Sequence, residues 1–196
     1  MRAFVAVDLS PDARQVLADA IRRLRAAAPR DLRWVDPPNI HLTLKFIAAL
    51  GLQQVDPVLA AMGRAAGQIA PFELKLDSLG SFPNARQPRV LWAGVAGDLA
   101  RLNALRDAVE RQVSALGLPQ EPQNFSPHLT LGRVREGVSP AARARIAGAL
   151  EAAVLAPSAP WRVATVQLIR STLTPGGSVY TSLGEVQLPG QGGPPP

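Results

Sequence analysis

The sequence contains no cysteine, which excludes disulfide bonds and thiolate metal sites. It also contains no run of about 18 consecutive apolar residues, so we expect no membrane-spanning helix. The first residues lead directly into an apolar strand pattern without the layout of a signal peptide, and we therefore expect a cytoplasmic protein. Lysine is scarce as well, since Lys45 and Lys75 are the only two, and arginine carries nearly all of the positive charge.

The balance of charges favours an anionic partner. The chain has 196 residues and a net charge of +6, which makes nucleic acid the first candidate. The alternative is that the arginines only form the solvent-exposed faces of helices and bind no partner. A hydrophobic fraction of 47% and a charged fraction of 18% are typical of a globular protein, and the length suits one domain or two small lobes with a shared core.

Histidine is as scarce as lysine, and each of the two histidines is the first residue of a copy of one tetrapeptide. His-Leu-Thr-Leu begins at His41 and again at His128. Each copy is apolar at every second position, which predicts a strand. Side chains alternate between the two faces of a strand, so the histidine and threonine of each copy share one face, with Thr43 beside His41 and Thr130 beside His128.

The expected elements repeat at the scale of a lobe. Phe4 lies 37 residues before His41, and Val90 lies 38 residues before His128. The two motifs are 87 residues apart, and the same offset relates a strand, a helix, the His strand, a second helix and a further strand in each half. The expected strands begin at Phe4, His41, Phe72, Val90, His128, Trp161 and Val179, and the strand from Trp161 runs to Leu173. The expected helices span 11–28, 53–69, 98–116 and 139–155. Between or after these elements we expect a loop over 81–89, a turn over 174–177 and a disordered tail over 190–196.

Two imidazoles and two hydroxyls on facing strands suit phosphate chemistry. The imidazole pKa lies near neutrality, so one ring can accept a proton while the other donates one. Threonine hydroxyls can donate hydrogen bonds to phosphoryl oxygens. A single His-x-Thr strand is most simply a structural histidine, but two matched copies favour a site. A zinc site would need carboxylates that neither motif contains, and a serine nucleophile would lack an acid partner.

These motifs resemble the RNA 2′,3′-cyclic phosphodiesterase family, formerly called 2′-5′ RNA ligases, within the two-histidine phosphoesterase superfamily. The resemblance runs to about Leu188. Besides the two His-Leu-Thr-Leu motifs, the segments that carry it are 2–9, 33–35, 39–46, 82–83, 89–92, 125–131 and the late Ser171-x-Leu173-x-Pro175-x-Gly177.

The resemblance implies an α+β fold with a pseudo-twofold duplication, in which largely antiparallel sheets line a central cleft and helices lie outside. It implies one bilobal domain over 1–189, with repeats over about 1–80 and 88–189. It further implies hydrolysis of RNA 2′,3′-cyclic phosphate to a 2′-phosphate end, with His41 as proton donor, His128 as proton acceptor, and Thr43 and Thr130 holding the phosphate.

Six other residues are candidates for substrate contact. Lys45 follows His41 by four positions, so on a regular strand it would share the histidine face and could contact phosphate. The alternative is that it is a solvent-exposed residue at the end of the strand. Arg133 follows His128 by five positions and would face away unless the strand bends. Two aromatic and two loop residues complete the set: Phe46 and Phe125 as stacking partners for a base, with core packing as the alternative, and Arg86 and Arg89 as contacts to the RNA backbone.

The sequence therefore predicts a monomeric RNA cyclic phosphodiesterase that uses no metal and no cofactor, with reverse 2′-5′ ligation as a second activity. Its expected partner is RNA, or an oligonucleotide, with a 2′,3′-cyclic phosphate end, and nucleotide binding is a further possibility. The rival interpretation is a protein that binds RNA or nucleotides without turning them over.

Overall fold

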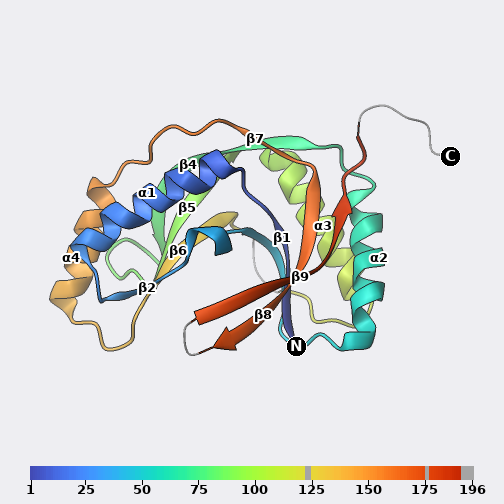
Figure 1. Cartoon of the computed structure of the whole chain (residues 1–196), viewed down its shortest axis with the longest axis horizontal. Coiled ribbons are helices and arrows are strands. Elements are labelled where there is room, and N and C mark those ends of the chain that lie inside the picture. The colour runs from blue at the N-terminus through green and yellow to red at the C-terminus, as the bar shows by residue number, and fades with distance from the viewer. Residues whose placement is uncertain (122–124, 175–176, 191–196) are drawn as a thin grey trace.

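The fold is α+β, as predicted, and a computed structural model describes it for residues 1–121, 125–174 and 177–190 (Figure 1). The α-helices in these residues are α1 (Pro11–Ala27), α2 (Val55–Ala66), α3 (Leu99–Ser114) and α4 (Pro140–Ala152). The strands are β1 (Arg2–Val7), β2 (Leu32–Trp34), β3 (Leu42–Ile47), β4 (Phe72–Phe82), β5 (Val90–Gly97), β6 (His128–Val134), β7 (Trp161–Val163), β8 (Thr165–Thr174) and β9 (Gly177–Gln187). Two 3-10 turns, η1 (Pro37–Asn39) and η2 (Leu52–Gln54), precede β3 and α2.

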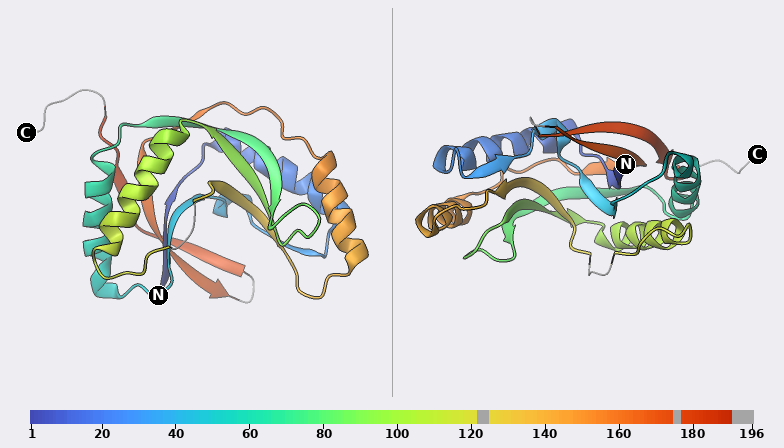
Figure 2. Two further views of the ribbon diagram at one scale, coloured as in Figure 1. Left: turned by 180° about the vertical axis from the view of Figure 1, so that it is seen from behind. Right: turned by 90° about the horizontal axis from the view of Figure 1, so that it is seen from below.

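All the described strands belong to one curled antiparallel sheet in the form of a half-barrel (Figure 2). The order is β7-β4-β5-β6-β3-β1-β8-β9, and β2 pairs with β6 beside this path. The two strands that carry the His-Leu-Thr-Leu motifs, β3 and β6, are therefore neighbours at the centre. On either side of them come β5 and β1, and then β4 and β8, which is the arrangement that a duplicated lobe would produce. The duplication itself stays a prediction.

Local sequence explains where the helices begin. Ser10 and Ser139 each accept a hydrogen bond from the backbone three residues ahead, and each is followed by a proline at the first helical position. Asp98 caps α3 in the same way, with its carboxylate accepting from the backbone N–H of Arg101. These are the starts that the sequence predicts.

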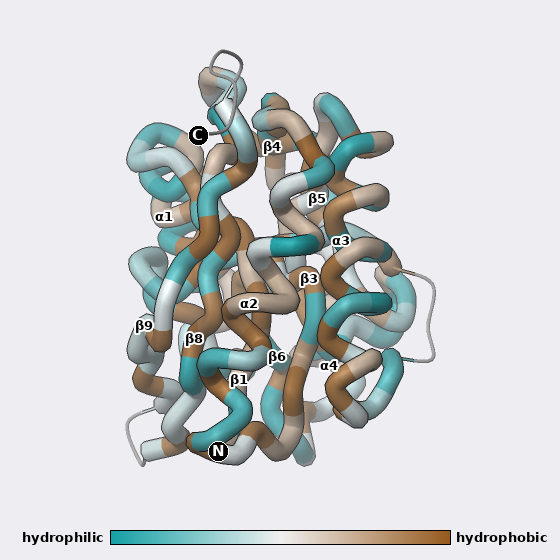
Figure 3. Tube along the Cα trace, turned by 90° about the vertical axis from the view of Figure 1, so that its right-hand side faces the viewer, coloured by the Kyte–Doolittle hydropathy of each residue, from teal (hydrophilic) through white to brown (hydrophobic). Residues whose placement is uncertain are grey.

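The helices lie in two pairs at opposite ends of the sheet, α1 with α4 and α2 with α3 (Figures 1 and 2). Hydrophobic and hydrophilic residues alternate along them, because each helix turns one face to the interior (Figure 3). The core lies between helices and sheet and includes the fully buried Leu42, Leu44, Leu129 and Leu131. No helix in the part of the chain that the structure describes is long and apolar enough to cross a membrane.

Several boundaries differ from the sequence-based expectation. The single strand expected from Trp161 to Leu173 is two strands, because β7 pairs with β4 while β8 pairs with β1 and β9. Strand β4 continues to Phe82, through a register shift between Leu76 and Leu79 that breaks the alternation. Helix α4 ends at Ala152 rather than near residue 155. The predicted turn at Pro175-Gly176 and most of the predicted tail, 191–196, lie outside the described residues.

Candidate active site

The pairing of β3 with β6 brings the two motifs together. Leu42 lies opposite Leu129 in this antiparallel pair, and both leucines point into the core. Their neighbours along each strand therefore point to the other face of the sheet. That face, here called the site face, carries His41, Thr43, His128 and Thr130, all of them partly exposed.

The antiparallel register sets the order of the four side chains. Because Leu42 lies opposite Leu129, Thr43 lies opposite His128 and Thr130 lies opposite His41. The two histidines are diagonal neighbours, for which backbone separations of roughly 7–8 Å are usual in a regular sheet. This spacing leaves room for one small group between the rings.

Each imidazole is oriented by the same local hydrogen bond. His41 Nδ1 lies 2.8 Å from the carbonyl oxygen of Asn39, and His128 Nδ1 lies 2.7 Å from that of Ser126. A carbonyl oxygen can only accept, so each Nδ1 carries a proton and donates it. The proton that each ring can gain or lose is therefore the one on Nε2.

Aromatic side chains from distant strands surround the two rings unequally. The Phe4 ring stacks on the His41 ring with 4.2 Å between centroids, and Tyr180 meets His41 edge-on at 5.3 Å. Among the described residues, His128 has one such neighbour, Phe82, which meets it edge-on at 5.0 Å. Sequence reasoning did not select Phe4, Tyr180 or Phe82 as site residues.

The surroundings of His41 shift its pKa. Burial lowers the pKa of His41 below its ordinary value, and the hydrogen bond to the Asn39 carbonyl and the charge of Asp8 oppose that shift. The neutral ring is thus favoured at position 41 before any substrate binds.

A bulge in each motif strand decides which further residues reach the site face. Val5 pairs with Lys45 and Ala6 pairs with Thr43, so Leu44 has no partner on β1. The same irregularity occurs between β5 and β6, where Leu131 is the unpaired residue. After each bulge the alternation is inverted, because two successive residues point into the core.

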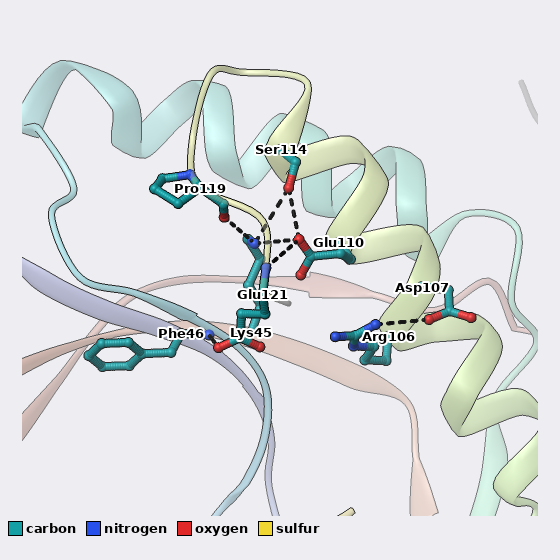
Figure 4. Close-up of polar contacts among 8 residues, drawn as sticks. All are labelled: Lys45, Phe46, Arg106, Asp107, Glu110, Ser114, Pro119 and Glu121. Carbon is teal, nitrogen blue, oxygen red and sulfur yellow. Dashed lines mark hydrogen bonds and ion pairs between the residues drawn. The ribbon is translucent and has the colours of Figure 1, made fainter. Parts of the chain in front are cut away.

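The prediction that Lys45 shares the histidine face is wrong for this reason. Its side chain is fully buried on the core side, where Nζ donates to Glu110 Oε1 at 2.8 Å and to the Pro119 carbonyl at 2.9 Å (Figure 4). Ser114 and the backbone N–H of Glu121 also donate to Glu110 Oε1. Burial raises the pKa of Glu110, but the hydrogen bonds from Lys45 and Ser114 and the lysine charge lower it by more, and the net shift is downward.

The inverted alternation instead turns Phe46 and Arg133 to the site face. They occupy equivalent places in the two strands, and both are exposed. The guanidinium of Arg2 lies 5.3 Å from the centroid of the Phe46 ring. Arg133 lies opposite Arg33 of β2, so two arginines stand side by side on this face.

The remaining candidates lie farther from the four central residues. Phe125 is partly buried against the core, and the guanidinium of Arg106 lies 5.6 Å from its ring centroid. Arg86 and Arg89 belong to the connection between β4 and β5 and line a surface hollow together with Arg143 of α4. Within the described residues, no group of three or more histidine, cysteine or acidic side chains has the proximity of a metal site.

Comparison with protein families gives a match to the 2′-5′ RNA ligase superfamily over residues 6–174. A Thermus thermophilus protein named RNA 2′,3′-cyclic phosphodiesterase is 34% identical, over 98% of this chain and 93% of the relative. A protein of the same name from Aeropyrum pernix is 32% identical, over 82% of this chain and 89% of the relative.

Solved structures agree with the sequence relatives. A crystal structure of a Thermus thermophilus protein is similar with a TM-score of 0.77 and 30% identity, and covers 98% of this chain and 100% of that one. The crystal structure of Escherichia coli LigT in complex with 3′-AMP is similar with a TM-score of 0.67 and 26% identity, over 95% of this chain and 97% of LigT.

Proposed function

The chain belongs to the 2′-5′ RNA ligase superfamily, and we propose that it hydrolyses 2′,3′-cyclic phosphate ends of RNA to 2′-phosphomonoesters with two histidines as acid and base. It is a hydrolase, as are its relatives named RNA 2′,3′-cyclic phosphodiesterase. The observation that supports the catalytic proposal most strongly is the central arrangement on the site face. Two imidazoles with identical Nδ1 hydrogen bonds stand diagonally across paired strands, each beside a threonine hydroxyl.

In the proposed reaction, water attacks the phosphorus atom and the bond to the 3′ oxygen breaks. His128 accepts the proton of the attacking water at Nε2, and His41 donates its Nε2 proton to the departing 3′ oxygen. The products are a 2′-phosphate and a free 3′-hydroxyl, and the two rings have exchanged their protonation states. Because the Nδ1 protons are held by backbone carbonyls, neither ring can use that nitrogen for the transfer.

The lowered pKa of His41 constrains this assignment. A proton donor must be charged when the substrate is bound, whereas burial favours the neutral ring in the free protein. The negative charge of a bound phosphate diester would raise the pKa of a ring beside it, as Asp8 already does in part. The donor role of His41 therefore depends on substrate binding to supply that charge.

The other residues of the site face act on the phosphate and the nucleoside. Thr43 and Thr130 are placed to donate hydrogen bonds to the non-bridging phosphoryl oxygens, where negative charge develops. Arg133 supplies a positive charge on the same face. Phe46 is placed for stacking on a base, and its present neighbour Arg2 would have to move aside.

The biological setting follows from the same proposal. The substrate is RNA with a 2′,3′-cyclic phosphate end, and the protein acts as a monomer in the cytoplasm. When the 5′-hydroxyl of a second RNA takes the place of water, the same site forms a 2′-5′ linkage: the 5′ oxygen attacks the phosphorus atom, and the bond to the 3′ oxygen breaks as before. A related LigT structure holds 3′-AMP, which supports binding of a free nucleotide at this site as well.

Turnover of a short RNA with a 2′,3′-cyclic phosphate end, in the presence of EDTA, tests the function. We expect conversion to a 2′-phosphate end at a rate that EDTA does not change. Tight binding of the same RNA without conversion would instead support the rival function, a binding protein. Loss of conversion in EDTA, restored by a divalent cation, would refute the metal-independent mechanism.

A further inference from the structure

A hollow of about 420 Å³ lies between the β4–β5 connection and the start of α4. Three of its five lining residues are arginines, namely Arg86, Arg89 and Arg143, and none is acidic. The six ion pairs between described residues include none of these three arginines. Three arginines line this hollow, and its other two lining residues are uncharged, which makes it a place for an anion.

The hollow, here called the arginine hollow, is held by bonds between two separate elements. Arg143 Nη1 donates to the carbonyl oxygen of Pro88 at 3.0 Å, which joins α4 to the connection. Within the connection, the Asn84 side chain accepts hydrogen bonds from the backbone N–H groups of Arg86 and Gln87. The first turn of α4 contains no acidic residue that would compete for the arginines. The positive groups are therefore presented by a fixed backbone.

The arginine hollow is connected to the site through the end of β6. The backbone N–H of Val134 donates to the carbonyl oxygen of Arg89 at 2.9 Å. Between Val134 and the catalytic centre lie Arg133 and its cross-strand neighbour Arg33. Like charges directly opposite each other destabilise a sheet, and a phosphate between them removes that cost. The arginine pair on the site face is therefore next along β6 to the residue whose backbone is bonded to Arg89 of the hollow.

The distance suits an oligonucleotide. Val134 lies six residue steps beyond His128 along β6, which corresponds to roughly 20 Å of strand at about 3.3 Å per residue. Stacked nucleotides advance by about 3.4 Å each. About six stacked nucleotides, or fewer in an extended chain, span the distance from the cyclic phosphate to the hollow.

We propose that the arginine hollow is a second phosphate-binding site, which takes a backbone phosphate of the RNA several nucleotides upstream of the cyclic end. The preferred substrate is accordingly a single-stranded polynucleotide rather than a nucleoside cyclic phosphate. This inference rests on the proposed function, since it concerns the body of the same substrate.

The test compares two RNAs of related sequence, a dinucleotide and an octanucleotide, each ending in a 2′,3′-cyclic phosphate. In the unaltered protein we expect a higher kcat/KM for the octanucleotide. In R86Q/R89Q, and separately in R143Q, the ratio of the two kcat/KM values should fall by about tenfold, since each variant removes charge-assisted contacts to phosphate. The ratio cancels any general effect of a variant on the catalytic centre or on the amount of folded protein.

A control with the same change of net charge is available on the far pair of helices. Arg64 of α2 and Arg111 of α3 are exposed, and R64Q/R111Q should leave the ratio as it is. The salt dependence of octanucleotide binding should also weaken in R86Q/R89Q, with the slope of log K against log salt falling by roughly 0.7 for each phosphate that the variant no longer neutralises.

The outcomes separate the inference from the proposed function. If the unaltered protein converts both RNAs and the ratio is the same in R86Q/R89Q, in R143Q and in R64Q/R111Q, the hollow does not bind substrate although the function stands. If the unaltered protein converts neither RNA, the proposed function itself fails. A lower ratio in the hollow variants and in the control alike would assign the effect to overall charge and overturn the inference.

Discussion

Replacing Lys45 by methionine should destabilise the protein strongly, although the lysine side chain points away from the site face. Methionine keeps the length of the side chain but removes the charge and its hydrogen bonds to Glu110 and Pro119. The lysine side chain is fully buried, and that of Glu110 is 12% exposed, so the carboxylate would be left without its main partner and with little access to water.

The magnitude follows from the burial of both groups. Breaking a buried ion pair by removing one partner costs about 3–5 kcal/mol of unfolding free energy. Glu110 Oε1 retains its bonds from Ser114 and the Glu121 backbone, and we therefore expect a value near the lower limit, about 3 kcal/mol. Replacing Glu110 as well, in K45M/E110M, should recover part of this loss, because no unpaired charge then remains in the interior.

Urea unfolding followed by tryptophan fluorescence measures the effect. The other lysine, Lys75, is exposed on β4 and provides the matched control, for which K75M should change stability by less than about 0.5 kcal/mol. A loss below about 1 kcal/mol in K45M would refute the reasoning, since it is the value of an exposed pair. Loss of turnover in a K45M protein of full stability would restore the interpretation of Lys45 as a phosphate contact.

Three further predictions concern the site and the buried pair. T43V and T130V should each lower kcat by about 10²–10³, the usual effect of removing one donor to a developing oxyanion, with unchanged thermal unfolding. Y180A removes the edge-on ring, which should admit water to His41 and raise its pKa. Proton NMR can follow this titration because the chain has only two histidines. An unchanged pKa of His41 in Y180A would show that Tyr180 contributes nothing to the burial of this ring. Since the folded-state pKa of Glu110 is lowered, the ion pair stabilises the protein fully above the ordinary glutamate pKa and is lost as the pH falls through the folded-state value. The stability difference between the parent and K45M should shrink over that acidic range, and a constant difference would contradict the assignment.

Much of the fold follows from patterns that are local in the sequence. The helix starts at Ser10, Asp98 and Ser139 depend on capping residues within one turn, and the structure confirms them. The α+β class and the family follow from the two His-Leu-Thr-Leu motifs and the segments around them. The placement of both motifs on neighbouring strands then comes from the sheet order.

What the sequence did not reveal depends on contacts between distant segments. The face of Lys45 and of Arg133 is decided by bulges opposite β1 and β5, and strict alternation assigns both residues to the wrong side. The aromatic rings beside the histidines come from β1, β4 and β9, and no spacing within the motifs indicates them. One signal was available for Lys45: it is one of only two lysines in an arginine-rich chain and lies within an apolar strand, where a buried partner could have been expected.

The central claim is that two histidines on paired strands open the cyclic phosphate together, and product analysis of a 5′-labelled RNA with a 2′,3′-cyclic phosphate end tests it directly. The unaltered protein should yield a 2′-phosphate, and H41A and H128A, with unfolding transitions like that of the parent, should each lose turnover by about 10³-fold or more. A 3′-phosphate product, or turnover that persists in either folded variant, would contradict the account.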